Sequence, residues 1–149
     1  MPKEHYMRGM GDAPSAGGGS ASSQAIQPHS PGLFFIYSFT VTLTALQSLP
    51  NQTISILDAP FKWILAAAQS TGPFTVNIRD GKNKRPFMNI PLHQNVIFGT
   101  AQHPFPILTP YTFEYRSNIL VDLVDLSNAS NTVWLGFIGV EVVDTVQNS

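Results

Sequence analysis

The residues that could perform chemistry in this chain are few, and their spacing keeps them apart. The four histidines are His5, His29, His93 and His103, and no two are separated by one residue, as ligands on one strand would be. The chain has no cysteine, which excludes disulfides, zinc–thiolate sites and thiol catalysis. The sequence therefore predicts no metal site, and we expect no cofactor.

The carboxylates do not converge in a way that supports acid–base catalysis. Asp122 and Asp125 are three residues apart on a predicted strand, so their side chains point to opposite faces, whereas a glycosidase needs two convergent carboxylates. Asp58 and Asp125 each precede turn residues and are predicted to form turns. The sequence contains no Gly-x-Ser-x-Gly elbow and no phosphate-binding glycine loop. We therefore expect a protein that is not an enzyme.

Charged residues are unusually sparse in this chain. They make up 11% of the 149 residues and leave a net charge of −1, against about a quarter in ordinary soluble domains. This balance argues against a general nucleic-acid binder, which needs a basic surface. No apolar run reaches the roughly 20 residues that span a bilayer, and residues 1–30 lack the apolar core of a secretory signal. We therefore expect no membrane contact, synthesis in a cytoplasm, and a surface partly covered by a partner.

One cluster of basic residues stands out at a predicted hairpin tip. It consists of Arg79, Lys82, Lys84 and Arg85, with Asp80 among them. Three interpretations are open: a solvated loop that protects a sheet edge, a contact with an acidic protein, or a contact with nucleic-acid backbone. The last is the weakest of the three, and no nucleic-acid partner is expected.

The first 31 residues differ in composition from the rest. They contain Gly17, Gly18 and Gly19 in a run of serine and alanine, and Ile26 is their only aliphatic residue besides alanine and methionine. Such a segment cannot bury enough apolar surface to offset the entropy of ordering it. It is either a flexible terminus or an extended arm held by a partner. We favour the arm, because about 30 extended residues reach roughly 100 Å, enough to cross a neighbouring subunit.

From Leu33 onward, apolar residues alternate with polar ones in short runs, which is typical of β-strands. Turn residues separate the runs, among them Leu49 to Gln52, and Asp80-Gly81, where Gly81 is expected to take a positive φ. The proline-rich stretch from His103 to Pro110 is predicted to be a connection outside any ladder. The predicted strands cover 39–44, 53–56, 61–69, 74–79, 87–90, 95–99, 112–115, 119–123 and 132–143. The apolar residues of 61–69 also fit one face of a short helix, and a strand is preferred there because the neighbouring segments are all β.

This pattern predicts an all-β protein with two parts. Residues 1–31 form the extended arm, and residues 32–149 form an antiparallel β-sandwich of jelly-roll type, because strands recur about every ten residues and no helix alternates with them.

The last predicted strand, 132–143, is apolar on both faces. Val133, Leu135 and Phe137 lie on one face, and the opposite face carries Trp134, Ile138 and Val140. A strand of this kind lies in a sandwich and is also covered from outside, or forms a subunit contact. Gly136 and Gly139 should weaken this strand unless a bulge or a close backbone approach compensates for them.

Several segments resemble small structural proteins of tailed bacteriophages, and are similar to the jelly-roll cement or decoration proteins of the capsid. The resemblance extends over residues 33–143 and carries over no site residues. The similar segments are Phe74–Asp80 (FTVNIRD), Asn95–Thr100 (NVIFGT), Pro104–Phe113 (PFPILTPYTF), Ser117–Ile119, Val121–Leu123 and Asn131–Gly139 (NTVWLGFIG).

The resemblance implies a protein that clamps neighbouring major capsid subunits on the virion surface, as a dimer or trimer at a symmetry axis. Its partner-binding residues would then be Gly17, Gly18, Gly19 and Ile26 of the arm, and Arg79, Lys82, Lys84 and Arg85 of the hairpin. The alternatives are a tail, neck or vertex component, or a jelly-roll module that binds carbohydrate or a receptor.

Overall fold

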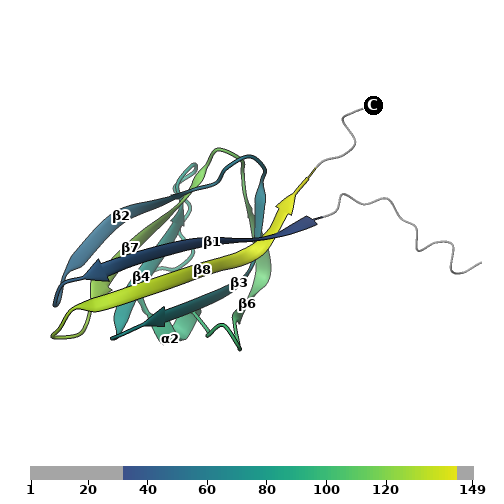
Figure 1. The fold of residues 1–149 in the computed structure, drawn as a ribbon. Coiled ribbons are helices and arrows are strands. Elements are labelled where there is room, and N and C mark those ends of the chain that lie inside the picture. Colours follow the sequence, from purple (N-terminus) through teal and green to yellow (C-terminus); the bar gives the residue numbers. More distant parts are fainter. Residues whose placement is uncertain (1–31, 144–149) are drawn as a thin grey trace, which may run out of the picture. The chain divides into compact units, whose positions relative to one another are not determined.

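Two four-stranded antiparallel sheets pack against each other in the computed structural model, which describes residues 32–143 (Figure 1). This arrangement confirms the predicted β-sandwich. No helix within this range is long and apolar enough to cross a bilayer. The elements are β1 (Gly32–Leu43), β2 (Ser48–Ser55), β3 (Phe61–Ser70), β4 (Phe74–Asp80), β5 (Leu92–His93), a helical turn α2 (Gln94–Ile97), β6 (Phe105–Phe113), β7 (Asn118–Asp125) and β8 (Asn131–Val142).

The strand order is that of a jelly roll. One sheet has the order β1-β8-β3-β6, and the other has the order β2-β7-β4-β5. The pairs β1–β8, β2–β7, β3–β6 and β4–β5 make the chain one long antiparallel ribbon that is folded over on itself. Rolling such a ribbon into two layers gives the jelly roll, as the sequence predicts.

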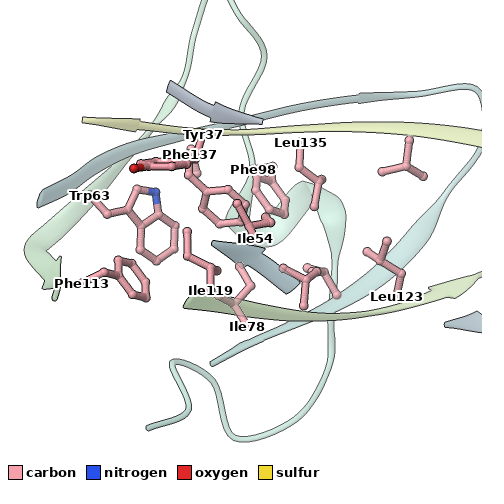
Figure 2. Packing of buried hydrophobic residues seen from close by; sticks show 14 of the residues in the cluster. Tyr37, Ile54, Trp63, Ile78, Phe98, Phe113, Ile119, Leu123, Leu135 and Phe137 are labelled. Carbon is pink, nitrogen blue, oxygen red and sulfur yellow. The ribbon is translucent and has the colours of Figure 1, made fainter. Parts of the chain in front are cut away.

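The core lies between the sheets, where every second residue of each strand points inward. Figure 2 shows Trp63 toward one end of this core, and its ring centroid lies 5.3 Å from that of Phe137 and 6.2 Å from that of Phe113. The buried polar atoms of the aromatic residues are satisfied: the Trp63 indole N–H donates to the Leu65 carbonyl at 2.9 Å, and the Tyr37 hydroxyl accepts the Leu57 N–H at 3.0 Å. The core therefore combines apolar burial with a fixed position for its largest rings.

The proline-rich segment is a strand, contrary to the prediction. β6 includes Pro106 and Pro110 and pairs with β3, and the predicted strand at 112–115 is only the end of it. Because β6 lies at the edge of its sheet, a proline there removes no hydrogen bond that the sheet requires.

Two predicted strands do not form. Phe87–Ile90 makes no ladder beyond a single bridge at Pro86, and Phe87 instead packs its ring 5.7 Å from that of Trp63. The segment 95–99 contains most of the helical turn α2, which His93 caps by accepting the Asn95 N–H on Nδ1 at 3.2 Å. Apolar residues here reach the core from irregular backbone.

The turn predicted at 49–52 does not form, whereas the chain does turn at residues 81–83 but without the predicted backbone conformation. The segment 49–52 is an irregularity within β2, where Asn51 adopts a left-handed φ of 57°. Gly81 does not take a positive φ, and Lys84 does so instead, at 62°. A Cβ at position 81 would overlap the side-chain oxygen of Asn118, so that side chain would have to move to accept any other residue.

Candidate interaction face

An apolar stripe covers the solvent side of the β1-β8-β3-β6 sheet. Phe34 and Ile36 of β1 are 71% and 45% exposed, and Trp134 of β8 is 42% exposed. The strand register places Phe34 opposite Val140, and Ile36 opposite Ile138, so these side chains are neighbours on one face. We call this stripe, defined by Phe34, Ile36, Trp134, Ile138 and Val140, the outer face. Contiguous apolar surface of this kind is uncommon on proteins that act alone.

A groove of about 760 Å³ is hollowed into the outer face beside residues 100–104. Ala67 and Gly136 are opposite each other in the β3–β8 register, and their small size gives the groove depth. Gly99 pairs with β3: its N–H donates to the Ala66 carbonyl at 3.2 Å, and its carbonyl accepts the Ala68 N–H at 2.8 Å. This pairing holds the segment 100–104 beside the sheet, where it forms one wall of the groove. We call this hollow the outer groove.

The lining of the outer groove decides which contacts it can make. Trp134 and Ile138 supply apolar surface, while Gln69, Thr100 and Gln102 supply neutral hydrogen-bonding groups. None of the lining residues is an acid, a base or a thiol. Elsewhere in residues 32–143, no three histidine or carboxylate side chains gather as metal ligands would. The groove is therefore suited to binding by apolar burial and amide hydrogen bonds.

The basic hairpin is held by contacts within the domain. The Arg79 guanidinium lies 2.8 Å from Asp122, and both contact Asn51: the Asn51 N–H donates to Asp122 at 2.7 Å, and Arg79 donates to the Asn51 side chain at 3.0 Å. Lys82 pairs with Glu114, and this hydrogen bond and negative charge raise the pKa of Lys82. These two cations are therefore neutralised in place, and Arg79 also fixes the irregular part of β2.

Arg85 and Lys84 complete the hairpin. Arg85 places its guanidinium carbon 5.4 Å from the ring centroid of Tyr111. The Tyr111 hydroxyl donates to Asp80 at 2.6 Å, and burial together with that bond raises the pKa of Tyr111. Lys84 is exposed at the tip. Contact with an acidic partner stays a prediction, and Lys84 is the residue of the four best placed for it.

The remaining predicted residues are placed as follows. Gly17, Gly18, Gly19 and Ile26 of the expected arm lie outside the described residues, as do His5 and His29. His93 caps α2, and His103 is exposed and is not one of the residues that line the outer groove. Neither described histidine lies near a second one in a ligand set.

A buried polar cluster, which sequence reasoning missed, ties together the β1–β2, β3–β4 and β7–β8 loops. Asp122 and Asp125 point to opposite faces as predicted, and Asp125 is only 1% exposed. Its carboxylate accepts the Leu46 N–H at 2.8 Å and the Asn131 side-chain amide at 2.9 Å. Asn131, fully buried, also accepts the Gly72 N–H at 2.9 Å. Asp125, the last residue of β7, thus cross-links these loops, whereas the sequence predicted only a turn-forming residue here.

Asp125 makes the stability of the domain depend on acidity. Burial alone would raise the pKa of its carboxyl, but hydrogen bonds from Asn131, Leu46 and Ser127 outweigh that effect and hold the pKa below its ordinary value. The folded state therefore binds its proton less readily than the unfolded chain does. The resulting stabilisation is complete above the unfolded pKa of about 3.9 and is lost as the pH falls through the lower folded value.

We predict that the free energy of unfolding, measured by urea titration, falls as the pH is lowered from 5 to 2. The fall should be smaller in Asp125→Asn, which cannot titrate at this position. An identical pH profile for the two proteins would contradict the assignment to Asp125.

Comparison of the chain with family models, with curated proteins and with solved structures gives no significant match. The outer face and the buried cluster must therefore be interpreted from their own chemistry.

Proposed function

We propose that this protein is a non-enzymatic structural component of a virion, a cement or decoration protein that holds neighbouring major capsid subunits together in a tailed phage head. The observation that carries the proposal is the outer face, where β8 presents Trp134, Ile138 and Val140 on the side away from the core. A central strand that is apolar on both faces is suited to a site that a partner covers.

The chemistry of the face supports protein binding. Trp134 and Phe34 are exposed aromatic side chains, and such residues are frequent energetic anchors of interfaces. The sparse charge of the chain limits the desolvation penalty of burying a large surface. A protein that binds two capsid subunits at once gains from the second contact, because that contact forms within a complex already assembled. The same argument applies to a tail, neck or vertex site, so an experiment must distinguish these locations from the head.

One observation favours a second candidate, a carbohydrate-binding module. Trp134 lies in the outer groove with Gln69 and Gln102, and an aromatic ring beside amide groups is a common sugar-binding arrangement in chemical terms. Against it, the groove continues into a longer apolar stripe that a single sugar would not cover.

The test measures binding of the full chain to shells assembled from the major capsid protein of the phage that encodes it. We expect the wild type to saturate the shells, and Trp134→Glu to reduce affinity by about 30-fold or more, because a charge would be buried at an aromatic anchor. The matched control is Leu57→Glu, which places the same charge on a side chain that is 53% exposed and outside the groove lining. It should bind within about twofold of the wild type.

Two results would contradict the proposal. One is failure of the wild type to bind the shells. The other is equal loss of binding in Trp134→Glu and Leu57→Glu. Binding to a glycan array that Trp134→Glu abolishes, without affinity for shells, would establish the carbohydrate candidate in its place.

A further inference from the structure

The edges of the two sheets differ in how well they are protected against pairing with another strand. In the part of the chain that the structure describes, the edge strands are β1, β6, β2 and β5. β6 contains Pro106 and Pro110, β2 contains Pro50 and an irregular register around Asn51, and β5 is two residues long. Prolines, bulges and short length are the usual devices that prevent edge-to-edge association.

β1 has none of these devices. It runs for 12 residues with the sequence GLFFIYSFTVTL, which contains no proline and no charged residue. Its register with β8 is continuous from Gly32 opposite Val142 to Leu43 opposite Asn131, so no bulge interrupts it. Figure 1 shows β1 running beside β8, and the strand order places β1 at the edge of the sheet. A long, regular, uncharged edge is a template for another strand.

The hydrogen bonds of β8 show which backbone groups of β1 point away from β8, toward the edge of the sheet as residues 32–143 define it. The Thr71 N–H donates to the Thr132 carbonyl, and the Val142 N–H donates to the Pro60 carbonyl, both on the β3 side of β8. The backbone N–H and C=O groups of successive residues point to opposite sides of a strand. Those of Thr132, Trp134 and every second residue to Val142 therefore point to β3, and those of the residues between them point to β1. The β1 residues whose own N–H and C=O therefore point to the open edge are Phe34, Ile36, Ser38, Thr40 and Thr42.

We propose that β1 pairs antiparallel with β1 of a second copy of this chain, joining two four-stranded sheets into one sheet of eight strands. An edge strand is complementary to itself across a two-fold axis, because each free N–H meets a free C=O of the copy. The lack of charge on β1 means that self-pairing brings no like charges together. This inference goes beyond the proposed function and does not depend on it.

The direction of the free groups restricts the register. Residues with free groups must lie opposite one another, so Ser38 faces either Ser38 or Ile36 of the copy when the overlap of the two strands is greatest. In both registers the two copies present their outer faces on the same side of the joined sheet. The exposed side chains of Phe34 and Ile36 lie on that side in each copy, so the two outer faces become continuous. The pair would present two outer grooves on one surface.

The test is the oligomeric state of the purified full chain, measured by sedimentation velocity and light scattering without any capsid. We expect a dimer of twice the chain mass of 16.3 kDa at micromolar concentration. Ser38→Pro removes an N–H that points to the open edge and leaves the β8 bonds intact. It should raise the dimer dissociation constant roughly 30-fold or more, equivalent to about 2 kcal/mol.

A second pair of variants guards against misfolding of the proline variant. Thr40→Lys places a charge on the exposed side of the β1 edge and should also give monomers. Thr112→Lys places the same charge on exposed β6, at the opposite edge of the same sheet, and should leave the dimer unchanged. Circular dichroism of each variant establishes that the sandwich is retained.

Cross-linking identifies the contact directly. Because the chain has no cysteine, Ser38→Cys carries a single thiol, and a short bismaleimide should link two copies, whereas Thr112→Cys should stay unlinked. A monomeric wild type, whether β1 is left open or is covered by residues 1–31, would overturn the proposal. So would an oligomer of any size that Ser38→Pro and Thr40→Lys leave intact.

Discussion

Gly139→Ala is expected to lower the free energy of unfolding by about 3 kcal/mol or more. Gly139 lies in β8 opposite Trp63, where the register of β3 shifts between Trp63 and Leu65. A Cβ at this position would overlap the carbonyl oxygen of Lys62 and press against the ring of Phe61. Backbone cannot rotate away as a side chain can, so β3 and β8 would have to separate along the centre of their sheet.

Gly136 provides the control for this prediction in the same strand. A Cβ there would lie 3.7 Å from the Ala67 carbonyl and 3.8 Å from Ile36, which is ordinary contact. Gly136→Ala should therefore change the free energy of unfolding by less than about 1 kcal/mol, since alanine suits a strand no worse than glycine. Urea titrations of both variants check the difference. Equal effects would show that the loss of stability comes from strand propensity and not from the close approach of the Lys62 carbonyl to Gly139.

Asp125→Ala is expected to destabilise the domain by about 3 kcal/mol, because removal of a buried acceptor leaves its donors without partners. The carboxylate binds the Leu46 N–H at 2.8 Å, the Ser127 hydroxyl at 2.9 Å and the Asn131 amide at 2.9 Å. Alanine would leave the Leu46 N–H without this acceptor and loosen the β1–β2 and β7–β8 loops.

The control is Asp58→Ala, which removes an exposed carboxylate from a loop. It should alter the free energy of unfolding by less than about 0.5 kcal/mol. Thermal melts followed by circular dichroism are sufficient for this comparison. If the two aspartate variants melt at the same temperature, the hydrogen bonds of Asp125 contribute no more to stability than those of an exposed turn.

The sequence predicts those strands best whose inward residues alternate without interruption. Phe74, Val76 and Ile78 in β4, and Ile119, Val121 and Leu123 in β7, are all fully buried as their spacing requires. Alternation is a local property, and hence it can be read without knowledge of the neighbours.

The errors arise where a neighbouring strand decides the structure. Pro106 and Pro110 are compatible with a strand only because β6 is at an edge, and an edge position is not visible in local sequence. The segment 95–99 is apolar because Phe98 is buried from a helical turn, not because it forms a strand. In both cases the residue types did not determine the backbone conformation, although Phe98 is buried as an apolar residue should be.

The candidate site could be predicted in part. The apolar outer side of β8 was evident from Trp134, Ile138 and Val140, and it led to the expectation of a covering partner. The wall of the outer groove was not predictable, because it depends on Gly99 pairing with β3, some 30 residues earlier in the chain. The role of Asn131 was hidden for the same reason, since its partners come from separate loops.

The jelly-roll ribbon also bears on how the chain folds during synthesis. β8 is the central partner of both β1 and β3, yet Gly32 meets its partner Val142 only after 110 further residues have been made. Contacts of such wide separation slow folding, since a long loop must close before any of them forms. While the ribosome is still extending the chain, β1 and β3 both lack their shared neighbour, and the first sheet can be completed only when translation of this domain is nearly finished.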